Sequence, residues 1–317
     1  MQINLAWAAS TSDTPYSNFG DALNPILLHL LTGRKITHSN FDSDESKLVA
    51  IGTILQDFRN GKVDVWGTGL DVRVPCQQGE RRHFDPRITN VDYCVHAVRG
   101  IMTAHTLSSF GVNVPKVYGD PAILLRRLLH SYVKGERQDK LGMVCHLSEL
   151  QNYTDFSEVS DLEFYKVDSE EAKVISPLTK PFAKCILEKI KEIASYNFIL
   201  SRSLHGLIIA DIFDIPCAYY TTGGFKSGVY SIFDNSVDID HRFRDYYSGI
   251  GRTVVPVYVC PDEGINVEDA KQFLTRNWEP VSQWDAISER LVNALPFCVE
   301  GYKDHTEFAS SIDALKL

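Results

Sequence analysis

Short apolar runs alternate along this chain with longer segments in which apolar residues recur every three or four positions. Runs such as residues 3–8 and 198–201 predict buried strands, because they are short and bounded by turn residues. Residues 181–194 predict an amphipathic helix, with an apolar stripe that begins at Phe182 and Ile186. The regular alternation of the two patterns is typical of α/β architecture.

This pattern predicts the following elements. The predicted strands are residues 3–8, 48–52, 63–67, 93–98, 141–145, 174–175, 198–201, 217–220 and 254–260. The predicted helices are residues 24–31, 103–110, 181–194, 204–213, 267–277 and 284–295. Pro25 is compatible only with the start of a helix, so we expect the first helix to begin close to Asp21.

A charged, polar segment at residues 130–140 interrupts the alternation and is a candidate linker. It predicts an N-terminal Rossmann-like domain at residues 1–132 and a C-terminal one at 140–296. Residues 297–317 would form a tail that packs back on the first domain. In such folds ligands bind beyond the carboxyl ends of the strands, so we expect the two domains to face a cleft that holds the chemistry.

Composition narrows the class of protein. The 317 residues are 44% hydrophobic and 23% charged, as in ordinary globular proteins, which excludes disordered and fibrous classes. The net charge of -9 comes without any basic arm, so binding of nucleic acid through a basic face is not expected. An anionic ligand would therefore need a local cluster of cations and backbone N–H groups.

The absence of a membrane-spanning pattern and the distribution of the cysteines both favour a cytoplasmic setting. No apolar run approaches the roughly 18 residues that a membrane-spanning helix needs, and the N-terminus lacks the basic start of a secretory signal. The seven cysteines are dispersed and form no C-x-x-C pair, which argues against a disulfide framework and a cysteine zinc site. A reducing, cytoplasmic setting is expected, and no metal-ligand cluster is visible.

The strongest candidate site is the segment Ser201-Arg202-Ser203-Leu204-His205-Gly206, which follows a predicted strand and opens a predicted helix. A helix N-terminus offers unpaired N–H groups, and Arg202 and His205 add two donors, so the segment suits a phosphate or carboxylate. The structural alternative is that Ser201 or Ser203 caps the helix, that Arg202 forms a surface ion pair and that His205 is packed.

Further candidates also follow strands. Arg99 ends one predicted strand and is equally compatible with a free surface arginine. Lys226 follows another strand after a glycine turn, and taken alone it fits a solvated loop lysine better than a site residue. Asp21 is a helix cap or a carboxylate that faces a sugar hydroxyl. Gly67-Thr68-Gly69 is a loop for close backbone approach, but the full dinucleotide fingerprint is missing.

Three other features are expected to be structural. The Gly119-Asp120-Pro121 segment is expected to form a turn. His96 lies inside a predicted strand and is expected to be a packed core histidine. Residues 243–247 are expected to pack in the core, although their aromatic rings also suit a sugar.

In this order the segments resemble the polysaccharide pyruvyl transferase family. The matching segments are Asn18-Phe19-Gly20-Asp21, Leu23-Asn24, Gly67-Thr68-Gly69, Val98-Arg99-Gly100 with Thr103, Gly119-Asp120-Pro121, Ser201–Gly206, Ala210, Pro216 and Lys226. They span about residues 16–230, and beyond residue 230 no motif carries over. The start of the chain looks most like bacterial exopolysaccharide ketal-pyruvate transferases, with Thr68 where the family more often has serine.

The resemblance implies a two-domain fold like that of GT-B glycosyltransferases, with phosphoenolpyruvate as donor. The acceptor would be a terminal sugar of a lipid-linked saccharide, and the product a cyclic pyruvate ketal and phosphate, in exopolysaccharide or capsule biosynthesis. The first domain would bind the acceptor and the second the donor. The resemblance implies no cofactor, since phosphoenolpyruvate is a co-substrate, and no metal. The enzyme would work in the cytoplasm, at the inner face of the membrane.

The resemblance also implies roles for individual residues. His205, Arg202 and Asp21 would be catalytic, with His205 as general acid because the pKa of histidine lies nearest to working pH. The donor site would contain Arg99, Arg202, Ser203, Leu204, His205 and Lys226. The acceptor site would contain Asn18, Asp21, Gly67, Thr68 and Gly69.

Two other functions remain open at this point. A nucleotide-sugar glycosyltransferase would share the two-domain architecture and a cationic diphosphate site. A non-catalytic saccharide- or phosphate-binding protein would keep the fold and release no phosphate. The choice of donor distinguishes the first alternative, and phosphate release distinguishes the second.

Overall fold

The computed structural model describes residues 2–11, 15–75, 81–150, 165, 170–261 and 263–299. These residues form an α/β structure with two separate, mainly parallel sheets. The first sheet contains, in spatial order, β3 (Lys35–His38), β1 (Gln2–Ala6), β4 (Lys47–Val49), β5 (Asn60–Trp66) and β8 (Asn90–Ala97). The second contains β10 (Ala172–Ile175), β9 (Gln138–Val144), β12 (Tyr196–Ser201), β13 (Cys217–Thr221), β15 (Val254–Val259) and β14 (Gly228–Ser231).

The two sheets share the order of their first four strands. Numbered as the chain forms them, the strands of the first sheet run 2-1-3-4-5 and those of the second run 2-1-3-4-6-5, and apart from β14 all neighbours pair in parallel. Only β14 is antiparallel, at one edge of the second sheet. In this order the chain reverses its winding between its first and third strands, and ligands bind beside that reversal. The reversal points are β1/β4 and β9/β12.

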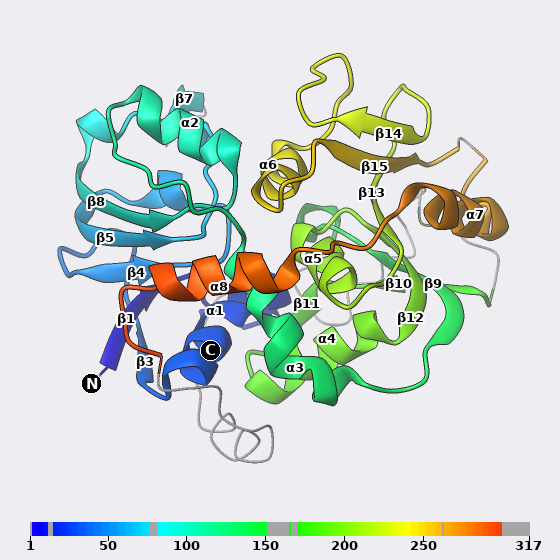
Figure 1. Ribbon diagram of the computed structural model, residues 1–317, viewed down its shortest axis with the longest axis horizontal. Coiled ribbons are helices and arrows are strands. Elements are labelled where there is room, and N and C mark those ends of the chain that lie inside the picture. The colour runs from blue at the N-terminus through cyan, green and yellow to red at the C-terminus, as the bar shows by residue number, and fades with distance from the viewer. Residues whose placement is uncertain are drawn as a thin grey trace.

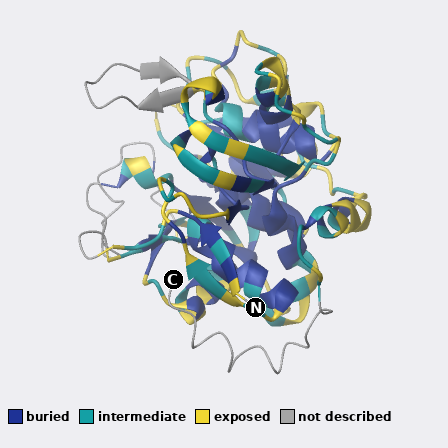
Figure 2. Cartoon of the chain, turned by 90° about the vertical axis from the view of Figure 1, so that its left-hand side faces the viewer, coloured by how far each residue is buried: buried dark blue, intermediate teal, exposed yellow. Residues whose placement is uncertain are grey.

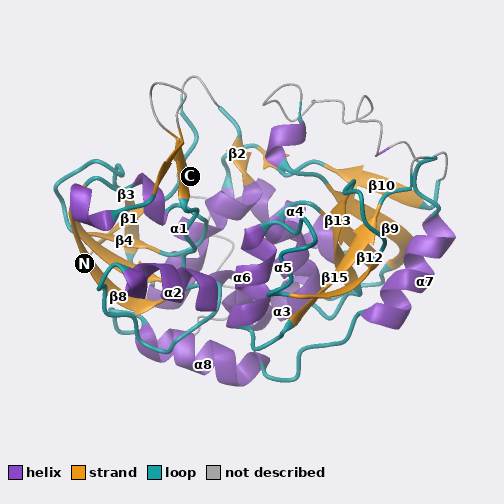
Figure 3. Ribbon diagram, turned by 90° about the horizontal axis from the view of Figure 1, so that it is seen from above, coloured by secondary structure: helices purple, strands orange, loops and turns teal. Residues whose placement is uncertain are grey.

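Helices fill the space between the sheets (Figure 1, Figure 3). The described helices are α1 (Phe19–Thr32), α2 (Ile101–Ser109), α3 (Leu125–Val133), α4 (Ala183–Ala194), α5 (Leu204–Ile212), α6 (His241–Gly249), α7 (Val267–Asn277) and α8 (Trp284–Ala294). Helix α1 packs on α4, α5 on the short 3-10 helix η3 (Pro121–Leu124), and α2 on α6, so each half contacts the other. Two short strands, β2 (Ser17–Asn18) and β11 (Leu178–Thr179), also pair across the halves. The remaining strands, β6 (Arg73–Pro75) and β7 (Arg81–His83), form a hairpin.

The largest apolar core runs through both halves. It joins side chains from the first sheet, such as Leu5, to side chains from the second, such as Val257. Figure 2 shows the buried residues concentrated in the strands and inner helices, with exposed residues on the outer rims. No helix among the described residues is long and apolar enough to cross a membrane.

Helix α1 starts earlier than the sequence predicts. Asn18 is its cap, and Pro25 lies inside the helix rather than at its start. Because proline has no N–H, the carbonyl of Asp21 loses its helical donor. The Asn24 side chain replaces it, since Nδ2 donates to the Asp21 carbonyl at 3.0 Å and to the Ile51 carbonyl at 2.9 Å. The helix thus begins at Phe19, within two residues of the expected start near Asp21, whereas the predicted range 24–31 starts five residues too late.

The predicted linker is also shorter than expected. Residues up to Val133 complete α3, and β9 begins at Gln138. The segment looks polar because α3 buries only one face, which includes Leu125 and Leu129. Every predicted strand and helix overlaps an observed one, whereas α3, α6, β3, β14 and the short strands β2, β6, β7 and β11 were not predicted.

The last described helix lies on the first sheet. Trp66, at the end of β5, donates its indole N–H to the carbonyl of Leu291 in α8 at 2.8 Å. Beyond α8, the ring of Phe297 lies under the guanidinium of Arg34, 5.5 Å from its carbon. The predicted boundaries assign α8 to the second domain, yet it packs on the first sheet. Residues 300–317 of the predicted tail lie outside the described residues.

Candidate functional site

A cavity of about 190 Å³ lies at the carboxyl ends of strands from both sheets. Ala8 follows β1 and Gly52 follows β4, while His146 follows β9 and Ser203 follows β12. These four strands flank the two reversal points, where the fold predicts a ligand. The wall consists of Ala8, Asn18, Asp21, Gly52, Thr53, Ile54, His146, Leu147, Pro177, Ser203, Leu204, His205 and Arg242.

Five of the residues expected from the sequence meet in this cavity. Asn18 and Asp21 come from the start of α1, and Ser203, Leu204 and His205 from the start of α5. Ser203 caps α5 by accepting a hydrogen bond from the Gly206 N–H at 3.3 Å, so its predicted structural role is confirmed. The N-terminus of α5, where a helix has N–H groups without partners inside the helix, therefore lies at the cavity wall.

Arg99 lies behind the wall rather than in it. Its guanidinium is fully buried, donates from Nε to Asp245 at 3.1 Å and from Nη1 to the Thr53 hydroxyl at 2.5 Å. Its Nη2 has no hydrogen-bond partner. The interpretation of Arg99 as a free surface charge is therefore wrong, because the chain buries it against Asp245.

The glycine loop supports the wall from the same side. Thr68 is buried and donates to the Gly52 carbonyl at 2.9 Å. A Cβ on Gly69 would lie 2.2 Å from the guanidinium of Arg99, so this position must be glycine for Arg99 to fit. Gly67, Thr68 and Gly69 are not among the described residues that line the cavity.

The remaining two predicted cations lie outside the cavity wall. Arg202 donates from Nε to Glu149 at 2.8 Å, in a partly buried ion pair. Lys226 is exposed on the loop that leads into β14. The structure thus brings Asn18, Asp21 and His205 together but does not bring Lys226 to them.

Arg242 and His146 are cavity residues that the sequence analysis missed. Arg242 lies in the first turn of α6, is held by Asp240 through Nη2 at 2.6 Å, and donates from Nη1 to His146 Nε2 at 3.0 Å. Nothing marks His146 locally. A charged triplet at a helix start, Asp240-His241-Arg242, is the one sequence signal for Arg242. The expected packing of residues 243–247 is confirmed, since Phe243 and its neighbours are buried.

The cavity residues Asp21 and His146 both have pKa values away from their ordinary ranges. Burial raises the pKa of Asp21 to about 6, although the Asn18 amide that donates to it at 3.0 Å and the charge of Arg242 both oppose this. Burial and the nearby Arg242 lower the pKa of His146 to about 4. His146 is therefore neutral near pH 7, as its acceptor role toward Arg242 requires.

Asp120 and His205 form a buried carboxyl–imidazole pair beside the cavity. Oδ1 of Asp120 accepts from the Ala122 N–H at 3.0 Å, so the expected turn is confirmed. Its Oδ2 has no hydrogen-bond partner and lies 3.9 Å from Nε2 of His205, which has none either. Two facing, unpartnered polar atoms in the interior are unusual and mark a candidate functional pair.

In this pair the pKa of the carboxyl lies above that of the imidazole, the reverse of their ordinary order. Burial raises the pKa of Asp120 to about 7. Burial, together with the charges of Arg99 and Arg242, lowers the pKa of His205 to about 3. Near neutral pH the imidazole is therefore neutral, and the carboxyl carries the titrating proton.

Gly20 fixes the position of His205. A Cβ on Gly20 would lie 2.1 Å from Nδ1 of the imidazole, so the starts of α1 and α5 touch without a side chain between them. His205 is thus buried, as the structural alternative expected, and it also lines the cavity, where the site prediction places it. The arrangement offers a small anion a helix N-terminus, an arginine and a proton donor in one place.

The sequence matches one known family. Residues 18–223 match the family model of the polysaccharide pyruvyl transferases. No curated protein and no solved structure matches the chain. The matched range includes Asn18, Asp21, Asp120 and His205 and ends before Arg242.

Proposed function

Because the chain belongs to the polysaccharide pyruvyl transferase family, we propose that it transfers the pyruvyl group of phosphoenolpyruvate to two hydroxyls of a terminal sugar. The product is a cyclic pyruvate ketal with release of phosphate. The acceptor is a lipid-linked saccharide of exopolysaccharide or capsule biosynthesis. The observation that carries this proposal is a small cavity lined by Arg242, by the start of α5 and by His205, which faces Asp120 behind the wall.

The proposed architecture is that of two Rossmann-like domains of the GT-B type, at residues 1–132 and 140–296. The shared order of the first four strands of each sheet and the position of the cavity between the reversal points support it. The acceptor would approach from the first domain, where Asn18 and Asp21 lie, and the donor from the second.

The donor choice rests on charge and size. Phosphoenolpyruvate carries a phosphate and a carboxylate, and the cavity offers it the N–H groups of α5 and the guanidinium of Arg242. Arg99 and Arg202 add positive charge from behind and beside the wall, whereas the role of Lys226 rests on the family resemblance alone. A cavity of about 190 Å³ is smaller than the roughly 300–1,000 Å³ of sites for drug-sized ligands, which favours this donor over a nucleotide sugar.

The reaction needs one proton at carbon and two hydroxyl attacks. A proton adds to the methylene carbon of phosphoenolpyruvate, and the carbon that carries the phosphate becomes cationic. The first sugar hydroxyl bonds to that carbon, and the second hydroxyl then replaces the phosphate, which leaves with its bridging oxygen. Of the two hydroxyl protons, one restores the acid, and the other is accepted by a base and then departs with phosphate.

Asp120 supplies the proton through His205 in this scheme. A neutral imidazole cannot donate and remain neutral unless it receives a second proton, and the protonated carboxyl of Asp120 faces its Nε2. The separation of 3.9 Å must shorten when the anionic donor binds, as catalytic contacts commonly do. His205 keeps its proposed role as the group nearest the substrate, and Asp120 is the proton source.

Asp21 is the proposed base for the acceptor. With its pKa near 6 it is mostly ionised at neutral pH, and it lies beside Asn18 on the wall of the first half. A carboxylate in this state accepts a hydroxyl proton, and the Asn18 amide orients it. No cofactor takes part in the proposed scheme.

Donor binding can be tested by thermal denaturation with phosphoenolpyruvate or with nucleotide sugars. A donor at 100 times its Kd stabilises the folded protein by about 2.7 kcal/mol. We expect this shift with phosphoenolpyruvate, its loss in Arg242→Gln, and its retention in Arg276→Gln, which changes an exposed arginine of α7. Stabilisation by a nucleotide sugar and not by phosphoenolpyruvate would overturn the donor assignment.

A further inference from the structure

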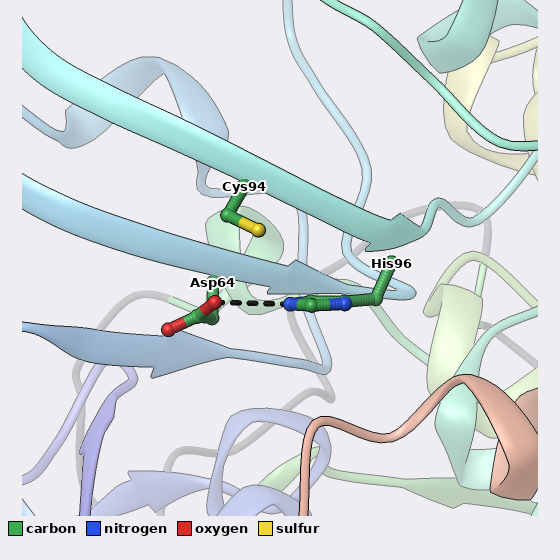
Figure 4. Close-up of side chains that lie close together, drawn as sticks. All are labelled: Asp64, Cys94 and His96. Atoms are coloured by element: carbon green, nitrogen blue, oxygen red, sulfur yellow. Dashed lines mark hydrogen bonds and ion pairs between the residues drawn. The ribbon is translucent and has the colours of Figure 1, made fainter.

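Three side chains with different donor atoms converge on one face of the first sheet (Figure 4). Asp64 lies on β5, and Cys94 and His96 lie on the neighbouring β8. A carboxylate oxygen, a thiol sulfur and an imidazole nitrogen all lie within 4.8 Å of one another. Nε2 of His96 is 2.9 Å from Oδ1 of Asp64.

The sheet holds two of the three residues in place. Asp64 and Cys94 are direct partners across the parallel pair, and His96 follows Cys94 by two residues, at the point where the register of the two strands shifts. The β5–β8 ladder therefore fixes the backbones of Asp64 and Cys94, and the local irregularity lets the His96 ring lie against Asp64. All three are half-buried, which leaves room for an ion and its water to enter.

We propose that Asp64, Cys94 and His96 form a binding site for a divalent transition-metal ion of the Zn²⁺ type. Sulfur and imidazole nitrogen together with one carboxylate oxygen are the donors that Zn²⁺ prefers, whereas Mg²⁺ and Ca²⁺ prefer oxygen alone. Three protein ligands leave a fourth tetrahedral position for water. The cysteine must bind as thiolate, so the ion displaces the thiol proton to solvent.

An ion pair alone explains only part of this geometry. The contact between His96 and Asp64 would exist without a metal, and it accounts for two of the three residues. Cys94 reaches Asp64 through cross-strand pairing and a thiol–carboxylate hydrogen bond. All three donor atoms together lie close enough to share one ion. His96 was expected to be a packed core histidine, and that prediction is wrong, since its side chain is 24% exposed.

The position of the site links it to the cavity. Asp64 lies three residues before Gly67, and His96 lies three residues before Arg99. A bound ion would cross-link β5 and β8 just before both strands end in the loops behind the cavity wall. Metal binding is therefore expected to stabilise these loops, independently of the identity of the substrate.

Titration of the reduced, metal-free, full-length protein with Co²⁺ and then Zn²⁺ tests the proposal. We expect one strong site per chain, with a thiolate-to-cobalt charge-transfer band that Zn²⁺ abolishes. Cys94→Ser should remove the band, and His96→Gln should weaken Zn²⁺ binding by at least the roughly 10- to 100-fold seen when an outer partner of a metal site is lost. Cys185→Ser changes a half-buried cysteine of α4 and should leave both unchanged.

Thermal unfolding supplies the second readout. Zn²⁺ should raise the Tm of the parent protein and of Cys185→Ser but not that of Cys94→Ser, and the metal-free Tm of each variant shows that it folds. The proposal is wrong if the parent protein gives no charge-transfer band. It is equally wrong if the band and the Zn²⁺-induced shift survive in Cys94→Ser.

Discussion

Replacing Asp120 by asparagine separates the catalytic from the structural role of this residue. Asparagine keeps the oxygen that accepts from the Ala122 N–H, so the turn before η3 is preserved. It removes only the ionisable group that faces His205. The variant should fold, lose activity and become more stable at high pH.

The magnitude follows from the shifted pKa. Burial raises the pKa of Asp120 from 3.8 to about 7, so the folded protein holds this proton more tightly than the unfolded chain. The associated stability is fully present below about pH 4 and is lost as pH rises through about 7. Ionised Asp120 thus costs the fold on the order of 4 kcal/mol at most, and Asp120→Asn escapes this cost.

Urea unfolding of both proteins between about pH 5 and pH 8 measures this difference. We expect Asp120→Asn to gain stability relative to the parent protein as pH rises, up to the limit above. Its kcat should fall by roughly 10²- to 10⁴-fold, the usual contribution of general acid catalysis. The decline of parent kcat as pH rises through about 7 should also disappear.

Asp57→Asn is a matched control. Burial raises the pKa of Asp57 to about 6. This residue lies in the 3-10 helix η1 (Leu55–Asp57), and its carboxylate accepts a hydrogen bond from Nε2 of Gln56 at 3.1 Å. Its replacement should change the pH dependence of stability and leave kcat unaltered. A stability difference for Asp120→Asn that stays constant with pH, or a kcat that is unchanged, would refute the proton assignment.

Three further substitutions test the site and its support. Gly20→Ala would place a methyl group 2.1 Å from the imidazole of His205. We expect it to lower the free energy of unfolding in urea by about 1–3 kcal/mol and kcat/KM by roughly 100-fold. The control Gly135→Ala, with nothing within 4 Å, should change neither. Arg242→Gln removes charged hydrogen bonds worth about 1.5–3 kcal/mol each and should raise the KM for phosphoenolpyruvate by roughly 10- to 100-fold; an unchanged KM would remove Arg242 from the donor site. Asn24→Ala leaves three buried backbone groups without partners and should cost about 3 kcal/mol or more in urea unfolding; a cost below about 1 kcal/mol would contradict its role in α1.

The fold was predictable where apolar periodicity is strong. Strands such as β12 and helices such as α4 bury one clear stripe or run, and they lie where the pattern predicts. Strand β3 could not be found this way, because Lys35–His38 is half-exposed and carries no apolar run. Helix α1 begins early because Asn24 compensates for Pro25, which is a tertiary contact with Ile51 that no local pattern displays.

The site was predictable only for its local parts. Asn18, Asp21 and His205 follow strand ends, and the carboxyl ends of parallel strands meet at one edge. Arg242 reaches the cavity only through the packing of α6, and Asp120 acts on His205 across space after its turn role is already satisfied. Asp64 and Cys94 meet only through the register of two strands.

The burial of Arg99 was missed, although the glycines around it in the sequence indicate it. Arg99 and its partner Asp245 lie directly against two glycines: a Cβ on Gly69 would meet the guanidinium, and a Cβ on Gly100 would meet Asp245. These glycines belong to the segments on which the family resemblance rests. A physical account of why they are glycine would have predicted a buried rather than an exposed Arg99.

The central claim is that this chain moves pyruvate from phosphoenolpyruvate to a sugar. The most direct measurement is phosphate release from phosphoenolpyruvate with and without a panel of glucosyl, galactosyl and mannosyl acceptors, each product weighed by mass spectrometry. We predict phosphate release that depends on one acceptor, whose mass increases by one pyruvate less water. Sugar transfer from a nucleotide sugar to the same panel, with phosphoenolpyruvate neither consumed nor bound, would contradict the account.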